Sequence, residues 1–109
     1  MIDRREARRD AKARVTAKGI FVVRCTVSGE GWVCNSRDLT SSETGLWFML
    51  RNGMHHNKAM QAAWNLHGGD AFRFEVLETL DDDLPPLLLR DALRDRQKHW
   101  QRELGASAL

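Results

Sequence analysis

The sequence predicts one α+β domain in which a small, mostly antiparallel three-stranded sheet is flanked by helices, in the order α-β-β-α-α-β-α. Three observations predict this class. Apolar and polar residues alternate in "AFRFEVLE" (71–78), as in a strand with one buried face. In "NKAMQAAWNLH" (57–67) the apolar residues instead recur at helical spacing. The length of 109 residues suits a single modest core.

The first segment is rich in positive charge. Residues 3–16 favour a helix by propensity but offer few apolar positions for packing. Residues 1–18 contain seven basic and three acidic side chains, a local charge of +4. We therefore divide the chain into a basic N-terminal helical extension (1–18) and a domain (19–105). The extension either binds phosphates or is a helix that simply faces water, and the sequence leaves both readings open.

A β-hairpin follows the extension. The stretch "IFVVRCTV" (20–27) is rich in β-branched and aromatic residues, and "WVCNS" (32–36) has a similar composition. The intervening "SGEG" supplies turn residues. These features predict an antiparallel pair, 20–27 with 31–35.

Two helices come next. The stretch "RDLTSSETGLWFMLRNG" (37–53) begins with hydroxyl residues able to cap a helix and stops at Gly53. The second helix is capped by Asn57 and broken by Gly68. Its apolar face consists of Met60, Ala63, Trp64 and His67.

The third strand and the last helix complete the domain. In the strand we expect Phe72, Phe74 and Val76 to point inward. The last helix, about 84–104, is expected to have Asp83 as its cap, with the prolines in its first turn and Gly105 as its stop.

Overall composition excludes several classes of protein. The net charge of +2 and the pI near 8.8 are by themselves no evidence for nucleic acid. No run approaches the roughly 20 apolar residues that span a bilayer, and the N-terminus lacks a secretion signal. We therefore expect a cytoplasmic protein with no membrane partner. The two cysteines and four histidines do not have the spacing of a zinc site.

Several motifs together resemble the GIY-YIG nuclease family over residues 19–104. The triplets "GIF" (19–21) and "WVC" (32–34) stand where the family has Gly-Ile-Tyr and Tyr-Ile-Gly. The most specific part is "HHNKAMQAAWN" (55–65) followed by "FRFEVLE" (72–78). The chain is most similar to small, stand-alone bacterial members whose motifs are relaxed.

The resemblance implies a catalytic site whose residues have mostly been replaced. The positions that match the family site are Phe21 and Trp32 for the two tyrosines, Ser42 for an arginine, His55 for a cleft histidine and Gln97 for the metal-ligating glutamate. We expect Phe21, Trp32, Ser42 and Gln97 to converge. Asp95 is expected to point away from the cleft, because it lies roughly 200° from Gln97 around the helix.

These replacements have a second, purely structural reading. Phe21, Trp32, Leu46 and Trp100 are apolar and would extend the core, while Asn35, Ser42 and Gln97 would form a hydrogen-bonded remnant. In the other reading, an exposed Trp32 would stack a base. The sequence alone does not decide between these two placements of Trp32.

The resulting prediction is a nuclease-like domain that has lost cleavage and binds nucleic acid, with DNA as the expected partner. The binding residues would be Arg37, Arg51, His55, His56 and Lys58. No cofactor is expected, and Mg²⁺ or Mn²⁺ only if the protein is active. Two alternatives stay open: an active metal-dependent endonuclease with a rearranged site that uses His55 as its base, and a protein-interaction scaffold.

Overall fold

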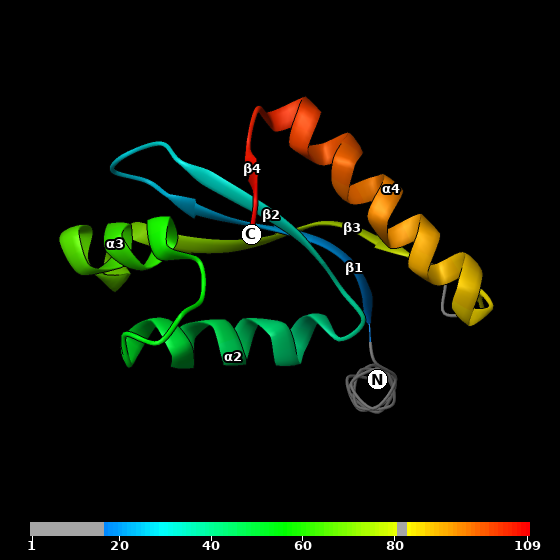
Figure 1. Ribbon diagram of the computed structural model, residues 1–109, viewed down its shortest axis with the longest axis horizontal. Coiled ribbons are helices and arrows are strands. Elements are labelled where there is room, and N and C mark those ends of the chain that lie inside the picture. Colours follow the sequence, from blue (N-terminus) through cyan, green and yellow to red (C-terminus); the bar gives the residue numbers. More distant parts are fainter. Residues whose placement is uncertain (1–16, 81–82) are drawn as a thin grey trace, which may run out of the picture.

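The computed structural model describes residues 17–80 and 83–109, which form three layers (Figure 1). One face of a central sheet is covered by α2 (Leu39–Arg51) and α3 (Lys58–His67), and the other by α4 (Pro86–Leu104). The strands are β1 (Lys18–Cys25), β2 (Gly31–Ser36), β3 (Phe72–Leu80) and β4 (Ser107–Ala108). A 3₁₀ turn, η1 (Gly69–Ala71), leads into β3. The helix expected at 3–16 lies outside the described residues.

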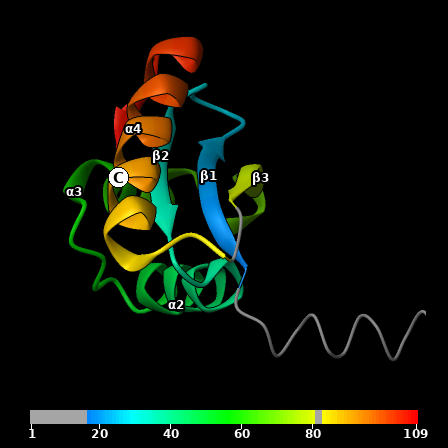
Figure 2. The ribbon, with the colours of Figure 1, turned by 90° about the vertical axis from the view of Figure 1, so that its right-hand side faces the viewer.

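The sheet has four strands in the order β3-β1-β2-β4, and Figure 2 shows β2, β1 and β3 side by side. The predicted hairpin is confirmed: β1 pairs with β2 antiparallel, with Phe21 opposite Cys34. Three strands were expected, and this number was one too few. Ser107 and Ala108 pair in parallel with β2, and the Leu109 N–H donates to the Val33 carbonyl over 3.0 Å. A two-residue strand is too short to produce an alternating pattern in the sequence.

Both faces of β1 are buried. Phe21, Val23 and Cys25 pack towards α2 and α3, whereas Ile20 and Val22 pack towards α4. Side chains alternate across a strand, so a strand covered on both faces has a nearly continuous apolar sequence. This explains the run "IFVV" and makes β1 the centre of two separate apolar cores.

A β-bulge interrupts the pairing of β3 with β1 just after Val76. Ile20 lies opposite Glu78 and Phe21 opposite Val76, so Leu77 is the extra residue. Val76 lies on the same face of the sheet as Phe21 and Phe74, but it is 46% exposed, so the prediction that it is an inward, buried position was wrong. Gly19 lies beside the bulge, where a Cβ atom would collide with the Glu78 carbonyl oxygen. A glycine is needed there because the two backbones approach so closely.

The helix starts differ in part from those expected. Asn57 caps α3 as predicted, since its side chain accepts a hydrogen bond from the Met60 N–H. The cap of α2 is Asp38 rather than a hydroxyl residue. Asp83 is not the cap of α4, which begins at Pro86 and has no side-chain cap. No described helix is long and apolar enough to cross a membrane.

Candidate functional site

The two aromatic residues on the hairpin are core residues. Phe21 is 2% exposed and stacks on Phe74, with ring centroids 4.6 Å apart. Trp32 is 3% exposed and stacks on Phe72 at 6.3 Å. Both side chains face α2 and α3. The reading in which an exposed Trp32 stacks a base is therefore wrong, and the core reading of both positions is confirmed.

Ser42 lies in the first turn of α2 and contacts the end of β2. Its Oγ is 2.6 Å from the Ser36 Oγ, and that same Ser36 oxygen accepts a hydrogen bond from the Asp38 N–H. Ser36 is buried. The two hydroxyls thus connect the first turn of α2 to the last residue of β2.

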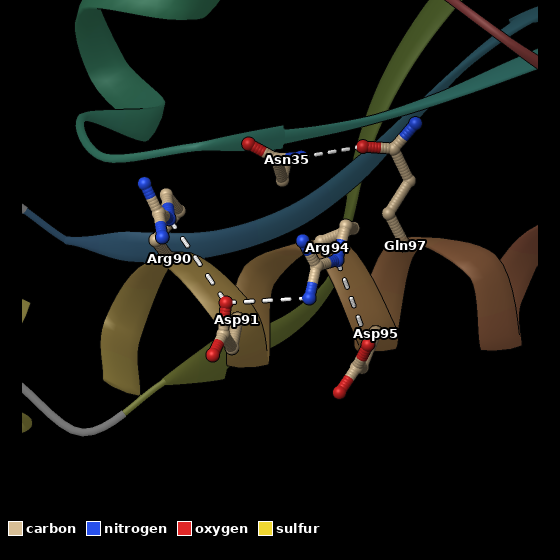
Figure 3. A network of polar contacts seen from close by, with 6 residues as sticks. All are labelled: Asn35, Arg90, Asp91, Arg94, Asp95 and Gln97. Carbon is tan, nitrogen blue, oxygen red and sulfur yellow. Dashed lines mark hydrogen bonds and ion pairs between the residues drawn. The ribbon is translucent and has the colours of Figure 1, made fainter. Parts of the chain in front are cut away.

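Gln97 uses both ends of its amide within the protein, and Figure 3 shows the bond between its oxygen and Asn35. Its Oε1 accepts from Asn35 Nδ2 over 2.5 Å, while its Nε2 donates to the Val33 carbonyl at 3.3 Å and to Gln101 Oε1 at 3.2 Å. Asp95 points away from β2, as expected, and its carboxylate lies 3.8 Å from Arg94. Gln97 therefore fastens α4 to β2, and its bond to Asn35 agrees with the predicted hydrogen-bonded remnant.

The expected single cleft does not form. Asn35 and Ser36 are consecutive on β2, so their side chains project to opposite faces of the sheet. Gln97 meets Asn35 on the α4 face, whereas Ser42 meets Ser36 on the α2 face, together with Phe21 and Trp32. The spacing of the motifs along the chain did not predict that these residues lie on two faces of the sheet, because this depends on which face of β2 each helix packs against.

His55 lies after the C-terminal end of α2, whereas Ser42 lies in its first turn. From Ser42 to Arg51 the helix advances by about 14 Å. The His55 Nδ1 accepts a hydrogen bond from the Asn57 N–H over 3.0 Å, so the neutral ring carries its proton on Nε2. Burial, together with the neighbouring His56, lowers the pKa of His55. Its ring also stacks on that of His56 at 4.5 Å.

The residues around Gln97 do not fit a divalent metal ion. Such ions prefer carboxylate oxygens, and Gln97 offers a neutral amide whose oxygen already accepts a hydrogen bond. Glu78 is a carboxylate on β3, but its Oε1 accepts from Arg96 Nε at 2.8 Å and Trp100 Nε1 at 2.9 Å. Within residues 17–80 and 83–109, no three His, Cys, Asp or Glu side chains group as metal ligands would.

Glu78 is a charged group that the sequence analysis did not single out. Burial raises its pKa, but the hydrogen bonds from Trp100 and Arg96 outweigh burial and hold the pKa below its usual value. The only sequence signal for Glu78 was its position as an acidic residue near the end of an apolar strand, followed by a helix that contains Arg96 and Trp100. Its role is to attach β3 to α4.

Basic side chains gather where α2 passes into α3. Arg51 ends α2, Lys58 begins α3, and His56 lies between them; all three are exposed. We call these three residues the basic junction. His55 is half-buried beside it, and Arg37 is exposed in the turn before the other end of α2. Four of the five predicted binding residues therefore cluster, and Arg37 stands apart.

Comparison with known proteins identifies the fold. No protein family and no curated protein matches the chain in sequence. Its structure matches the catalytic domain of the homing endonuclease I-TevI with a TM-score of 0.69 and 23% identity, over 81% of this chain and 88% of that one. A mutant of the intron endonuclease I-TevI catalytic domain matches with a TM-score of 0.70 and 22% identity, over 83% and 86% of the two chains. The predicted GIY-YIG fold is thereby confirmed.

Proposed function

We propose that this chain, which has the fold of an endonuclease catalytic domain, has lost phosphodiester cleavage and acts as a nucleic-acid-binding module. The observation that carries the proposal is the state of Gln97. At the position where the resemblance calls for a metal-ligating glutamate, an uncharged amide is bound on both sides by the protein itself. A side chain committed in this way holds two elements together and is poorly suited to binding a metal ion.

Phe21, Trp32 and Ser42 lie on the opposite face of the sheet from Gln97, so the groups that cleavage would need to combine are not brought together here. Their chemistry also supports the loss of cleavage. Cutting a phosphodiester requires an activated water and positive charge at the phosphate. Phe21 has no hydroxyl, and the indole N–H of Trp32 can only donate. Both rings are also buried in the core. Ser42 is uncharged and cannot replace an arginine, whose planar guanidinium offers a positive charge and paired N–H donors.

Support for binding comes from the basic junction and from the fold. Arg51, His56 and Lys58 are all exposed at the junction of α2 and α3, where phosphate groups can approach them. The proteins with the same fold are described as a homing endonuclease and an intron endonuclease. Fold alone does not establish function, so the junction is what makes the proposal specific.

A salt titration of binding tests this proposal. We expect the affinity for a short DNA to fall as salt rises, with a slope of about −0.9 in log K for each phosphate neutralised. The double variant Arg51→Gln/Lys58→Gln removes up to two such contacts and is expected to bind more weakly, with a shallower slope.

The control for this titration is Arg94→Gln, which removes one exposed arginine from α4 on the other side of the sheet. This variant should bind like the wild type. Binding that does not depend on salt, or an equal loss of affinity in Arg94→Gln and in the junction variant, would overturn the proposal.

A further inference from the structure

A hollow lined by aromatic rings lies next to the basic junction. Its volume is about 370 Å³, and its lining residues are Trp47, Arg51, Trp64, Gly69 and Phe72. This volume is near the lower end of small-ligand sites, which measure roughly 300–1,000 Å³. The hollow is lined by α2, α3, η1 and β3, which follow one another along the chain. The sequence pattern placed Trp64 on an apolar helix face and gave no sign of the hollow.

The rings of the hollow are held in place by their neighbours. Trp47 and Trp64 lie 5.8 Å apart between centroids, and Trp64 lies 5.3 Å from Phe72. The Trp47 Nε1–H donates to Glu43 Oε2 over 3.2 Å. The indole of Trp64 covers Gly69, where a Cβ atom would come within 2.8 Å of its Cη2. Both indoles are half-buried, so each is fixed on one side and open on another.

The charge around the hollow is polarised along α2. Arg51 is the only charged residue in its lining, and its guanidinium forms no hydrogen bond or ion pair with the side chain or backbone of any described residue. Glu43 lies about 12 Å away, eight residues earlier on the same helix. A ligand with an aromatic body and an anionic group therefore fits in one direction, with its anion at Arg51.

We propose that this hollow binds a nucleotide, with its base against Trp47 and Trp64 and its phosphate at Arg51. Within the proposed function, on which this inference rests, the ligand is an unpaired nucleotide of a single strand. Indole rings stack on any base, and a guanidinium binds phosphate through paired N–H donors. A base-paired nucleotide has its faces covered by its neighbours, so duplex is the poorer ligand. The Trp47 N–H already donates to Glu43, so it is not available to hydrogen-bond the edge of a base. Binding should therefore depend little on which base is present.

The indole N–H signals of the labelled protein provide a direct readout. The chain has four tryptophans. Trp100 packs against the α4-side core, on the other face of the sheet from the hollow, whereas Trp32 stacks on Phe72, which lines the hollow. Titration with AMP is expected to shift the Trp47 and Trp64 signals most and to leave the Trp100 signal in place. Ribose 5-phosphate, which lacks the base, should not produce these shifts. No shift with AMP would overturn the inference.

The affinity for an oligonucleotide then shows whether the hollow binds a nucleotide that is part of a single strand. For a labelled single strand of about 12 nucleotides, Trp47→Leu is expected to weaken binding roughly 5- to 150-fold. The matched control is Phe48→Leu, an exposed ring on the same helix that does not line the hollow. Arg51→Gln should weaken binding of both AMP and the strand. Thermal unfolding of each variant verifies that it is folded.

The outcomes separate this inference from the proposed function. If the strand binds wild type and Trp47→Leu equally, the hollow inference is wrong while nucleic-acid binding stands. If AMP shifts the two indoles but no oligonucleotide binds, the nucleic-acid-binding function is wrong and the ligand is a free nucleotide. A hollow that takes a protein partner instead would respond to neither probe, which would also overturn the inference.

Discussion

Gln97 and Trp32 illustrate what single residues reveal in this chain. Their identities were enough to predict which chemical groups are missing, because an amide and an indole cannot replace a carboxylate and a phenol. Their locations were not predictable in the same way. Gln97 bonds to Asn35 on one face of the sheet, whereas Trp32 is buried on the other. Side-chain direction depends on strand register and helix docking, which motif spacing does not encode.

Glu78 gives the first prediction at this scale. Its pKa lies below the usual value in the folded protein, because the bonds from Trp100 and Arg96 outweigh the effect of burial. A depressed folded pKa stabilises the protein above the unfolded pKa of about 4.3, and this contribution is lost as pH falls through the folded pKa. At neutral pH, urea unfolding should therefore show a lower free energy of unfolding for Glu78→Gln than for the wild type. Near pH 3 the difference in the free energy of unfolding between the two proteins should be smaller.

The matched control for this prediction is Glu75→Gln, an exposed glutamate on the same strand that pairs with Arg24 at 3.2 Å. Its effect on stability should be small at either pH, because exposed ion pairs contribute little. The account of Glu78 fails if Glu78→Gln and Glu75→Gln show the same dependence on pH.

The secondary-structure elements divide into those that local signals specify and those that tertiary contacts create. The helix α3 was predicted with its cap and its end, because Asn57 and Gly68 carry strong boundary signals. The strand β4 and the bulge of β3 were not predicted. Ser107 and Ala108 form a strand only because β2 offers an edge, and the bulge depends on pairing with β1.

The two neighbouring apolar residues of β3 give a prediction at the scale of the element. Val76 is 46% exposed, so Val76→Thr should change the free energy of unfolding by no more than about 0.5 kcal/mol. Leu77 packs against the α4-side core, so Leu77→Ala should cost about 2 kcal/mol, at the low end for a leucine truncation. Chemical denaturation of the two variants measures both values. A larger effect at Val76 than at Leu77 would contradict this assignment of the exposed and the packed position on β3.

The molecule as a whole combines an endonuclease-type fold with a modest charge. The net charge of +2 is too small to identify a nucleic-acid-binding protein. What matters is that Arg51, His56 and Lys58 are exposed between the end of α2 and the start of α3, and that Arg51 also lines the aromatic hollow. The fold class was predictable because several motifs occur in a fixed order. The hollow was not, since it arises only when α2, α3 and β3 are packed together.

Incubation of purified protein with supercoiled plasmid and Mg²⁺ or Mn²⁺ is the most direct test of the central claim. We predict that the plasmid stays supercoiled with the wild type. Gln97→Glu should behave in the same way, because the replaced groups at Phe21, Trp32 and Ser42 would still be missing. Nicking that requires the metal ion, accompanies the wild-type protein through purification and disappears in His55→Ala would contradict the claim and establish an active endonuclease.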